Sequence, residues 1–278
     1  MPVSARRFLR KMRGGAQAHL LEAADDKFYI VKFTNNPQSR RILINEWIAS
    51  AILKYLEIAH PDVALIDISS DFIAQFPDVH FQLGASRKAV EPGWHFGSAF
   101  PGDPAKQAVY DFLPDVLLAK VANKQQFLGA LAFDKWTGNS DSRQSIFFRA
   151  RIENWYPTPG GPEDRVGFIA QMIDHGYIFD GPHWSFTDSP LSGLYMRTGI
   201  YQDVRGFDSF EPWLSRIQHF PEEVIDKALR EIPQQWLQNE DSGELEKMMD
   251  RLLRRRKRVP DLIRDLKGGR TDPFPNWQ

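Results

Sequence analysis

The spacing of apolar residues changes near residue 105, and this change constrains the fold more than any other feature of the sequence. Before it, short runs of β-branched and aromatic residues predict strands at 16–22, 28–33 and 63–69. One longer stretch, 42–58, repeats its apolar residues with the period of an amphipathic helix. After it, helical spacing dominates. We therefore predict an α+β chain with a strand-rich N-terminal part and a mostly helical C-terminal part.

Shorter runs complete the N-terminal part and lead into the C-terminal part. The apolar stretch 72–76 reads as a further strand, and residues 97–104 read as a connector. Helical spacing follows at 106–115 and 123–136. These assignments place an N-terminal lobe at 1–100.

The C-terminal lobe, 101–278, contains one exception to its helical pattern. Residues 145–154 and 165–174 read as a pair of strands joined by the Pro- and Gly-rich loop 155–164. Short helices are then predicted to the end of the chain, at 209–218, 221–232 and 242–258.

Composition excludes several classes of function. The formal net charge is -1, so no overall basic field favours nucleic acid, and the sequence has no cysteine for disulfides, thiolate catalysis or cysteine zinc sites. The basic N-terminus lacks the apolar stretch of a signal peptide, and no segment has the length and apolarity of a membrane span. We expect a soluble, cytoplasmic protein.

Two charged residues stand out among the apolar residues of the first lobe. Lys32 ends the aromatic and β-branched strand "FYIVKF", where a lysine commonly extends to the surface from a strand edge. Glu46 lies one turn into the helix 42–58, where the helix dipole favours an acid. The alternative is an ion pair in which Glu46 holds Lys32 toward a nucleotide phosphate.

The loop "GNSDSRQSIFF" and the segment "MIDHG" carry the other candidates. Asp141 precedes Gln144 by three residues, and Gln144 directly precedes a strand. An acid that orients a hydroxyl, followed by an amide oxygen that holds Mg²⁺, suits phosphoryl transfer, although a polar turn has the same letters. Arg143 would steady the catalytic carboxylate or a phosphate, or form a surface salt bridge. Asp174 follows a strand and precedes a glycine, as a metal ligand or a turn residue would.

The order of these features is more informative than any one of them. A glycine pair, two strands joined by a turn with a lysine on the second, a glutamate helix, a connector, an Asp/Gln loop, a strand hairpin and Asp-x-Gly follow one another as in a bilobal kinase. A second register, Asp134 to Asn139, fits the spacing D-x-x-x-x-N. We prefer Asp141 and Gln144 because Asn139 does not lead directly into a strand.

These motifs resemble those of the HipA-like kinases, within the protein-kinase-like fold that includes phosphatidylinositol kinases. "GNSDSRQSIFF" is similar to the catalytic loop of that family, "IDHGYIFDG" to its metal-binding segment, and "RGGAQAHLLE" with "FYIVKF" to its glycine loop and lysine strand. The resemblance covers about residues 13–180 and implies a bilobal protein-kinase-like fold.

The resemblance also implies roles for the candidate residues. It implies an ATP- and Mg²⁺-dependent phosphotransferase that moves the γ-phosphoryl group to a hydroxyl, by resemblance that of a protein Ser or Thr. In it, Asp141 is the catalytic acid/base, and Gln144 and Asp174 hold Mg²⁺. The nucleotide is bound by Lys32, by Glu46 through Lys32, and by the backbone of Gly14, Gly15, Ala16 and Gln17.

Two further classes of function stay open. Gln144 stands where the family usually has Asn, and the glycine loop has only two glycines, so a nucleotide-binding pseudokinase acting as a regulator or scaffold is an alternative, as is a kinase of small-molecule or lipid hydroxyls. The third class is an interaction protein. The segment 251–258 has six basic residues in eight, typical of a solvated helix face or of a site for an anionic partner.

Overall fold

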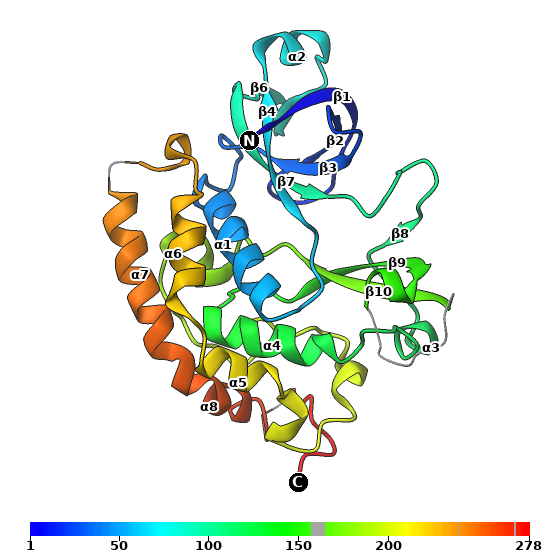
Figure 1. Cartoon of the computed structure of the whole chain (residues 1–278), viewed down its shortest axis with the longest axis vertical. Helices are drawn as coiled ribbons and strands as arrows, with labels where there is room; N and C mark the ends of the chain where they lie inside the picture. Colours follow the sequence, from blue (N-terminus) through cyan, green and yellow to red (C-terminus); the bar gives the residue numbers. More distant parts are fainter. Residues whose placement is uncertain (157–164, 239, 270) are drawn as a thin grey trace.

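A five-stranded barrel forms the N-terminal end of the molecule (Figure 1). The structure is a computed structural model that describes residues 1–156, 165–238, 240–269 and 271–278. Neighbouring strands follow the order β1-β2-β3-β7-β4, and parallel pairing of β1 with β4 closes the barrel. Their bounds are Val3–Lys11 (β1), His19–Ala23 (β2), Phe28–Lys32 (β3), Val63–Ile68 (β4) and Gly93–Ala99 (β7). The strands predicted at 16–22, 28–33 and 63–69 are thereby confirmed as β2, β3 and β4.

Strand β1 is an element that the sequence analysis missed. Arg6 and Arg7 are exposed on it, whereas Val3, Ala5 and Phe8 pack against the barrel core. Because two arginines stand side by side, the alternation of apolar and polar residues that marks a half-buried strand is interrupted. The register shifts of the β1–β2 pair fall at the same place, between Ala5 and Arg7 and again after Phe8.

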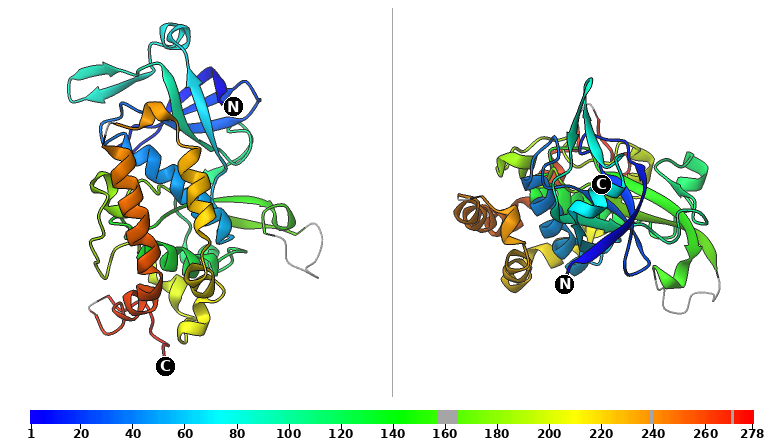
Figure 2. Two further views of the ribbon diagram at one scale, coloured as in Figure 1. Left: turned by 60° about the vertical axis from the view of Figure 1, so that its left-hand side comes forward. Right: turned by 90° about the horizontal axis from the view of Figure 1, so that it is seen from above.

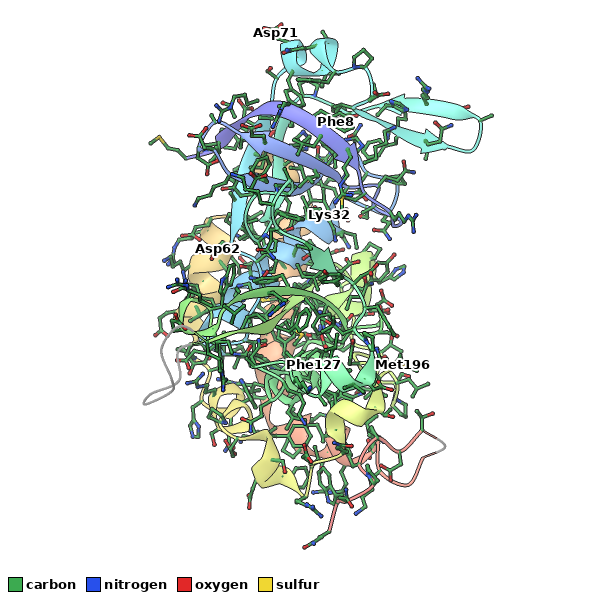
Figure 3. The ribbon with its side chains drawn as sticks, turned by 90° about the vertical axis from the view of Figure 1, so that its right-hand side faces the viewer. Phe8, Lys32, Asp62, Asp71, Phe127 and Met196 are labelled. Atoms are coloured by element: carbon green, nitrogen blue, oxygen red, sulfur yellow. The ribbon has the colours of Figure 1, made fainter. Side chains whose placement is uncertain are left out.

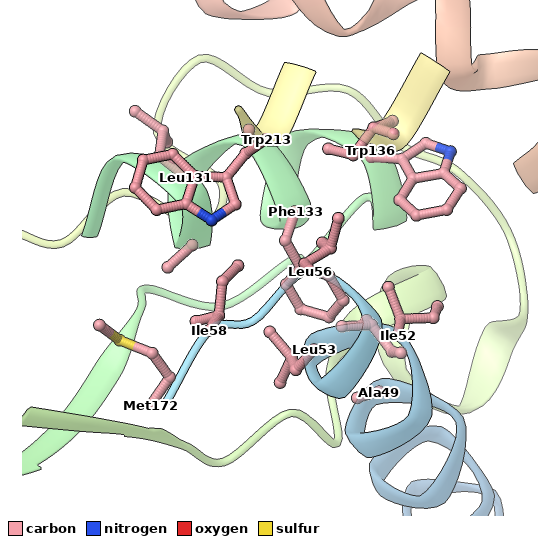
Figure 4. Packing of buried hydrophobic residues seen from close by; sticks show 14 of the residues in the cluster. Ala49, Ile52, Leu53, Leu56, Ile58, Leu131, Phe133, Trp136, Met172 and Trp213 are labelled. Atoms are coloured by element: carbon pink, nitrogen blue, oxygen red, sulfur yellow. The ribbon is translucent and has the colours of Figure 1, made fainter. Parts of the chain in front are cut away.

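Helix α1 (Arg41–Tyr55) confirms the predicted helix but not its predicted amphipathic character. Its buried residues lie on every side: Ile42, Leu43, Ile44, Asn45, Glu46, Ile48, Ala49, Ser50, Ile52 and Leu53. Except for Ile42, the apolar ones join the larger core, which they share with α4 (Gln126–Thr137), and not the core of the barrel. Figure 4 shows Leu53 and Leu56, at the end of α1, beside Phe133 of α4. The division of the chain at residue 100 stays a prediction, while side-chain packing joins α1 to the C-terminal core.

The C-terminal part combines a small sheet with helices. β10 (Val166–Ile173), β9 (Gln144–Arg151) and β8 (Val109–Tyr110) form an antiparallel sheet in that order, which confirms the predicted strand pair. The predicted loop between β9 and β10 lies, from residue 157 to 164, outside the described residues. The α-helices of this part are α3 (Asp115–Leu118), α4, α5 (Trp213–Gln218), α6 (Glu222–Arg230), α7 (Asp241–Arg255) and α8 (Val259–Arg264). Its 3₁₀ helices are η1 (Ile152–Asn154), η2 (Ile178–His183), η3 (Thr198–Tyr201), η4 (Phe207–Phe210), η5 (Gln234–Trp236) and η6 (Arg256–Arg258).

Two predicted elements are wrong in type. The stretch 72–76, predicted as a strand, belongs to helix α2 (Ser70–Gln75), because the Ser69 hydroxyl accepts a hydrogen bond from the Phe72 N–H (3.0 Å) and caps the helix. The stretch 106–115, predicted as a helix, contains the short strand β8 and only begins α3. Apolar runs of this length do not distinguish a strand from a helix.

A hairpin projects from the barrel, as the left view of Figure 2 shows. Its strands are β5 (His80–Leu83) and β6 (Ser86–Ala89), and every residue of β6 is exposed. Among the described residues, none of the helices has the length and apolarity needed to cross a bilayer.

Two buried histidines in the barrel predict acid sensitivity. His95 accepts a hydrogen bond at Nδ1 from the Thr34 N–H (3.0 Å), and His19 packs between Phe8 and Phe33. Burial lowers the pKa of each to about 4, whereas an unfolded histidine has a pKa of about 6.5. The unfolded chain therefore binds protons first, and the contribution of these two histidines to the free energy of unfolding should fall as the pH drops from about 6.5 to about 4, then level off.

Chemical denaturation between pH 4 and 7 measures this effect. His19→Phe, which keeps an aromatic ring in the same packing, should remove part of the slope in this pH window, while the exposed His183→Phe should not. Equal slopes for the wild type and His19→Phe would contradict the assignment of the slope to His19.

Candidate active site

Lys32 joins the barrel to the C-terminal part through two ion pairs. Its Nζ lies 2.5 Å from Oε1 of Glu46 on α1 and 2.7 Å from Oδ1 of Asp174, the first residue after β10. Figure 3 shows Lys32 between the strands of the barrel and the rest of the molecule. The predicted ion pair of Lys32 with Glu46 is thus present. Its position follows from β3 and β7: Lys32 is the last residue of β3, opposite Phe96 of β7, so its side chain leaves the barrel at the end nearest α1.

The charges of this triad stabilise one another. Burial lowers the pKa of Lys32, but the carboxylates of Glu46 and Asp174 outweigh it and raise that pKa above its usual value. Burial raises the pKa of Asp174, but the Lys32 ammonium outweighs it, with smaller contributions from Arg143 and the Gln144 amide, and keeps that pKa below its usual value. Asp174 and Lys32 are therefore both ionised at neutral pH.

The loop between α4 and β9 places Asp141 and Gln144 beside Asp174. Helix α4 ends at Gly138, whose φ of 61° is the left-handed conformation that favours glycine at this position. The Asp141 N–H then donates to Oδ1 of Asn139 (3.1 Å), and the Gln144 amide donates to Oδ2 of Asp141 (3.3 Å). Gln144 also stands opposite Ile173 in the β9–β10 pair and lowers the pKa of Asp174, so its amide lies near both carboxylates.

These side chains fit a magnesium site of the kind that substrate phosphates complete. Among the described residues, no three His, Cys, Asp or Glu side chains gather to hold a metal alone. Mg²⁺, however, takes one or two protein oxygens together with phosphate oxygens and water. Asp174 offers such an oxygen, and the Gln144 amide, whose NH₂ now faces the carboxylates, would offer its oxygen after a half-turn of the amide.

Arg143 lies in a buried ion pair, not in the surface salt bridge considered from the sequence, and its catalytic role stays a prediction. Its Nε donates to Oδ2 of Asp134 (2.8 Å) and its Nη2 to Oδ1 of the same carboxylate, with both side chains almost fully buried. Its Nη1 donates to the Ile173 carbonyl (2.9 Å) and lies 3.0 Å from Nδ1 of His175. Arg143 thus ties α4 to the residues on either side of Asp174.

Asp134 and Asn139, the residues of the second register, belong to the same buried cluster as Arg143. Both side chains are fully buried, and Asn139 donates to Oδ1 of Asp134 (2.9 Å). They pack on the buried side of the loop between α4 and β9, whereas Asp141 on the same loop is partly exposed. The sequence analysis missed Asp134 as the partner of Arg143, because a partner nine residues away on a helix leaves no pattern in the sequence.

The predicted glycine loop connects β1 to β2. The Gln17 N–H donates to the Gly14 carbonyl (3.1 Å) in a turn where Gly14 has a φ of 119°. The side chain of Gln17 is fixed on the projecting hairpin, because it donates to the Gln82 carbonyl (2.8 Å) and accepts from the Gln82 N–H (2.7 Å). Gly15 and Ala16 complete the loop, of which Gly14 and Gly15 are exposed and Ala16 is buried.

Most basic residues of the segment 251–258 bind carbonyls or carboxylates of the same chain. Arg251 donates to the Trp184 carbonyl (2.6 Å), Arg256 to the Phe220 carbonyl (2.7 Å), and Arg255 pairs with Asp188 (2.5 Å). Arg258 pairs with Asp188 as well (3.1 Å). These contacts hold α7 and η6 on the C-terminal core, and an anionic partner for this segment stays a prediction.

Comparisons with known proteins agree with this geometry. The family model described as HipA-like kinase matches residues 6–148, just over half of the chain. No curated protein sequence gives a match. The solved structure of the Golgi casein kinase is similar over 94% of this chain and 74% of its own, with a TM-score of 0.53 and 11% identity.

Two further structures show the same similarity. The Golgi casein kinase with Mn/ADP bound gives a TM-score of 0.51 at 12% identity, over 97% of this chain and 74% of its own. The Helicobacter pylori proinflammatory kinase CtkA gives 0.50 at 10% identity, over 95% and 97%. At these identities the likeness establishes the fold, and the predicted α+β, kinase-like fold class is confirmed.

Proposed function

Because the chain belongs to the HipA-like kinase family, we propose that this kinase is an ATP- and Mg²⁺-dependent phosphotransferase that moves the γ-phosphoryl group to a hydroxyl. The observation that carries the proposal is the triad of Lys32, Glu46 and Asp174, which links the barrel to the segment beside the Asp141 loop. Phosphoryl transfer needs a cation for the phosphates, an acid for the metal and a carboxylate for the acceptor hydroxyl, and these three groups meet here.

Each residue then has a defined task. Lys32 binds the nucleotide phosphates, and Glu46 holds its ammonium in place. Asp141 accepts the proton of the acceptor hydroxyl, and the backbone of the loop from Gly14 to Gln17 covers the phosphates. Mg²⁺, held by Asp174 and Gln144, neutralises charge on the phosphate oxygens when it is bound. For Arg143 we propose a positioning role, since its donors hold the residues beside Asp174.

The segment beside the Asp141 loop supports a polypeptide acceptor. The Gly193 N–H donates to the Asp141 carbonyl (2.8 Å), and the Arg143 N–H donates to the Leu194 carbonyl (3.2 Å). On either side of this contact, Leu191 and Met196 leave 46% and 54% of their surface exposed. Apolar side chains at such a position suit the side chains of a protein substrate, and we propose a protein Ser or Thr as the acceptor.

Asp141→Asn tests the proposed base. In a loose phosphoryl-transfer transition state the acceptor proton moves late, so we expect kcat to fall by on the order of 10², toward the lower end of general-base effects, while KM for ATP stays unchanged. Transfer of labelled phosphate from ATP to the protein itself and to a library of peptides measures it. Asp71→Asn, an exposed acid in α2, is the control and should retain wild-type kcat.

The other outcomes separate the alternatives. Equal kcat for Asp141→Asn and the wild type would exclude the proposed base. Nucleotide-dependent thermal stabilisation of the wild type, without turnover on peptides, small alcohols or lipids, would favour the regulatory pseudokinase. Labelling of a small molecule or a lipid but not of peptides would replace the proposed acceptor. The cytoplasmic location stays a prediction.

A further inference from the structure

We propose that Asn45 is a positioning residue that fixes the metal-binding segment around Asp174, an inference that rests on the proposed function. Asn45 is fully buried in α1 and directly precedes Glu46. Its Nδ2 lies within hydrogen-bonding distance of three main-chain carbonyls of the segment after Asp174: Gly176 (2.7 Å), Gly181 (2.9 Å) and Ile178 (3.1 Å). One side chain of the helix therefore holds most of a loop that comes more than 130 residues later.

The orientation of the Asn45 amide is itself fixed. Its Oδ1 accepts a hydrogen bond from the indole Nε1–H of Trp184 (2.9 Å), which leaves the NH₂ group for the three carbonyls. The guanidinium of Arg41 lies over the Trp184 ring at 4.0 Å and pairs with Asp241 of α7 (2.8 Å). Because the indole N–H of Trp184 needs an acceptor and the carbonyls need donors, only one orientation of the amide serves both, with its two N–H bonds shared among the three carbonyls.

The segment that Asn45 holds has an unfavourable backbone. Asp174, Phe179 and Asp180 have φ values of 57°, 57° and 58°, in the left-handed region where side chains other than glycine are disfavoured. Such a conformation persists only where surrounding contacts require it. The inward carbonyls that bond Asn45 belong to this conformation, so the amide stabilises it.

Close packing brings α1 onto the same segment. At Gly176, a Cβ would stand 2.4 Å from Cγ2 of Ile42, so only glycine allows the helix to approach this closely. Ile42, Asn45 and Glu46 thus lie along one side of α1 and contact, in turn, Gly176, the three carbonyls and Lys32. The helix sets the position of the Lys32 ammonium and of the Asp174 carboxylate together.

Metal binding without turnover tests the role of Asn45. We would titrate Mn²⁺, detected by its electron paramagnetic resonance, into the full chain with ADP, and measure ADP binding without metal in parallel. Asn45→Asp removes the donors at nearly constant volume, and it should weaken Mn²⁺ binding about 10- to 100-fold, as loss of a group that orients a metal ligand does. ADP binding without metal should not change, since Lys32 keeps Glu46.

Trp184→Phe is the second variant, in case Asn45→Asp does not fold. It keeps an aromatic ring in place of the indole and removes the N–H that orients the amide, and we expect Mn²⁺ binding about 10-fold weaker. Asn123→Asp is the matched control. Asn123 is a buried asparagine that donates to the Ala170 carbonyl (2.8 Å) of β10, so this change should lower the melting temperature but not the Mn²⁺ affinity.

The outcomes distinguish the two levels of the proposal. Wild-type Mn²⁺ affinity in both Asn45→Asp and Trp184→Phe would overturn the role of Asn45 and leave the proposed function in place. Failure of the wild type to bind Mn²⁺ with ADP would overturn both. If Asn123→Asp weakened Mn²⁺ binding as much as Asn45→Asp, the effect of Asn45 would come from general core stability, and its positioning role would be wrong.

Discussion

Asp174→Asn should lower kcat for phosphoryl transfer by on the order of 10³ or more, with little change in folding. The amide keeps the shape of the side chain but removes the charge that attracts Mg²⁺, and metal stabilisation of a phosphoryl transition state amounts to several kcal/mol. The carboxylate that now lies 2.7 Å from Lys32 is also lost as a partner, although Glu46 still holds the ammonium at 2.5 Å. The measurement is kcat at saturating ATP over a wide range of Mg²⁺ concentration.

The Mg²⁺ dependence separates a lost ligand from a lost fold. We expect the rate to rise with Mg²⁺ concentration and then saturate in the wild type and in the control, Asp62→Asn, whose side chain is exposed near β4, whereas excess Mg²⁺ should not restore the rate of Asp174→Asn. Circular dichroism should give the same folded spectrum for all three proteins. Undiminished activity of Asp174→Asn would remove Asp174 from the metal site and the proposed mechanism with it.

Arg143→Met should lower the free energy of unfolding by about 3–5 kcal/mol, because it leaves the buried Asp134 carboxylate without its counter-ion. Both side chains are almost fully buried, and the guanidinium forms two hydrogen bonds to this one carboxylate. Urea denaturation measures the change. The double variant with Asp134→Asn should recover part of the loss, since it removes the unpaired charge and keeps an acceptor for Asn139.

The same pair of variants decides between stability and catalysis for Arg143. A positioning role predicts that activity follows the stability of the fold around Asp174 and returns in part with the double variant. A catalytic role predicts a large fall in kcat at unchanged stability, with no recovery when Asp134 is also changed. The buried geometry leads us to expect the first result.

The sequence was sufficient for those site residues whose position depends on local structure. Lys32 ends a strand and Glu46 lies one turn into a helix, and both elements have strong apolar patterns, so their pairing could be predicted. Asp141 and Gln144 could be placed because a strand follows at once. The order of the motifs along the chain then indicated a common site.

What the sequence could not show are contacts between distant residues. Asn45 is a polar residue next to Glu46 in a largely apolar helix, and the neighbouring sequence does not indicate that its partners follow more than 130 residues later. The burial of Arg143 depends on Asp134 and on the Ile173 carbonyl, which only the folded chain brings together. Strand β1 was missed because the adjacent Arg6 and Arg7 interrupt its alternation of apolar and polar residues. Helix α2 was mistaken for a strand because a single cap, Ser69, determines that it is a helix.

Helix α1 packs in the C-terminal core, so Glu46 and Asp174, the two partners of Lys32, both belong to the C-terminal part. If the barrel moved away from that part, both partners would stay on the same side. Lys32 would move with the barrel, while Glu46 and Asp174 would stay behind as neighbouring carboxylates that repel each other once their shared ammonium has left. An opened molecule would therefore attract a divalent cation more strongly than a closed one. On closing, Lys32 would return to Glu46 but would find its place beside Asp174 taken by the cation, so its positive charge would be available for the nucleotide phosphates.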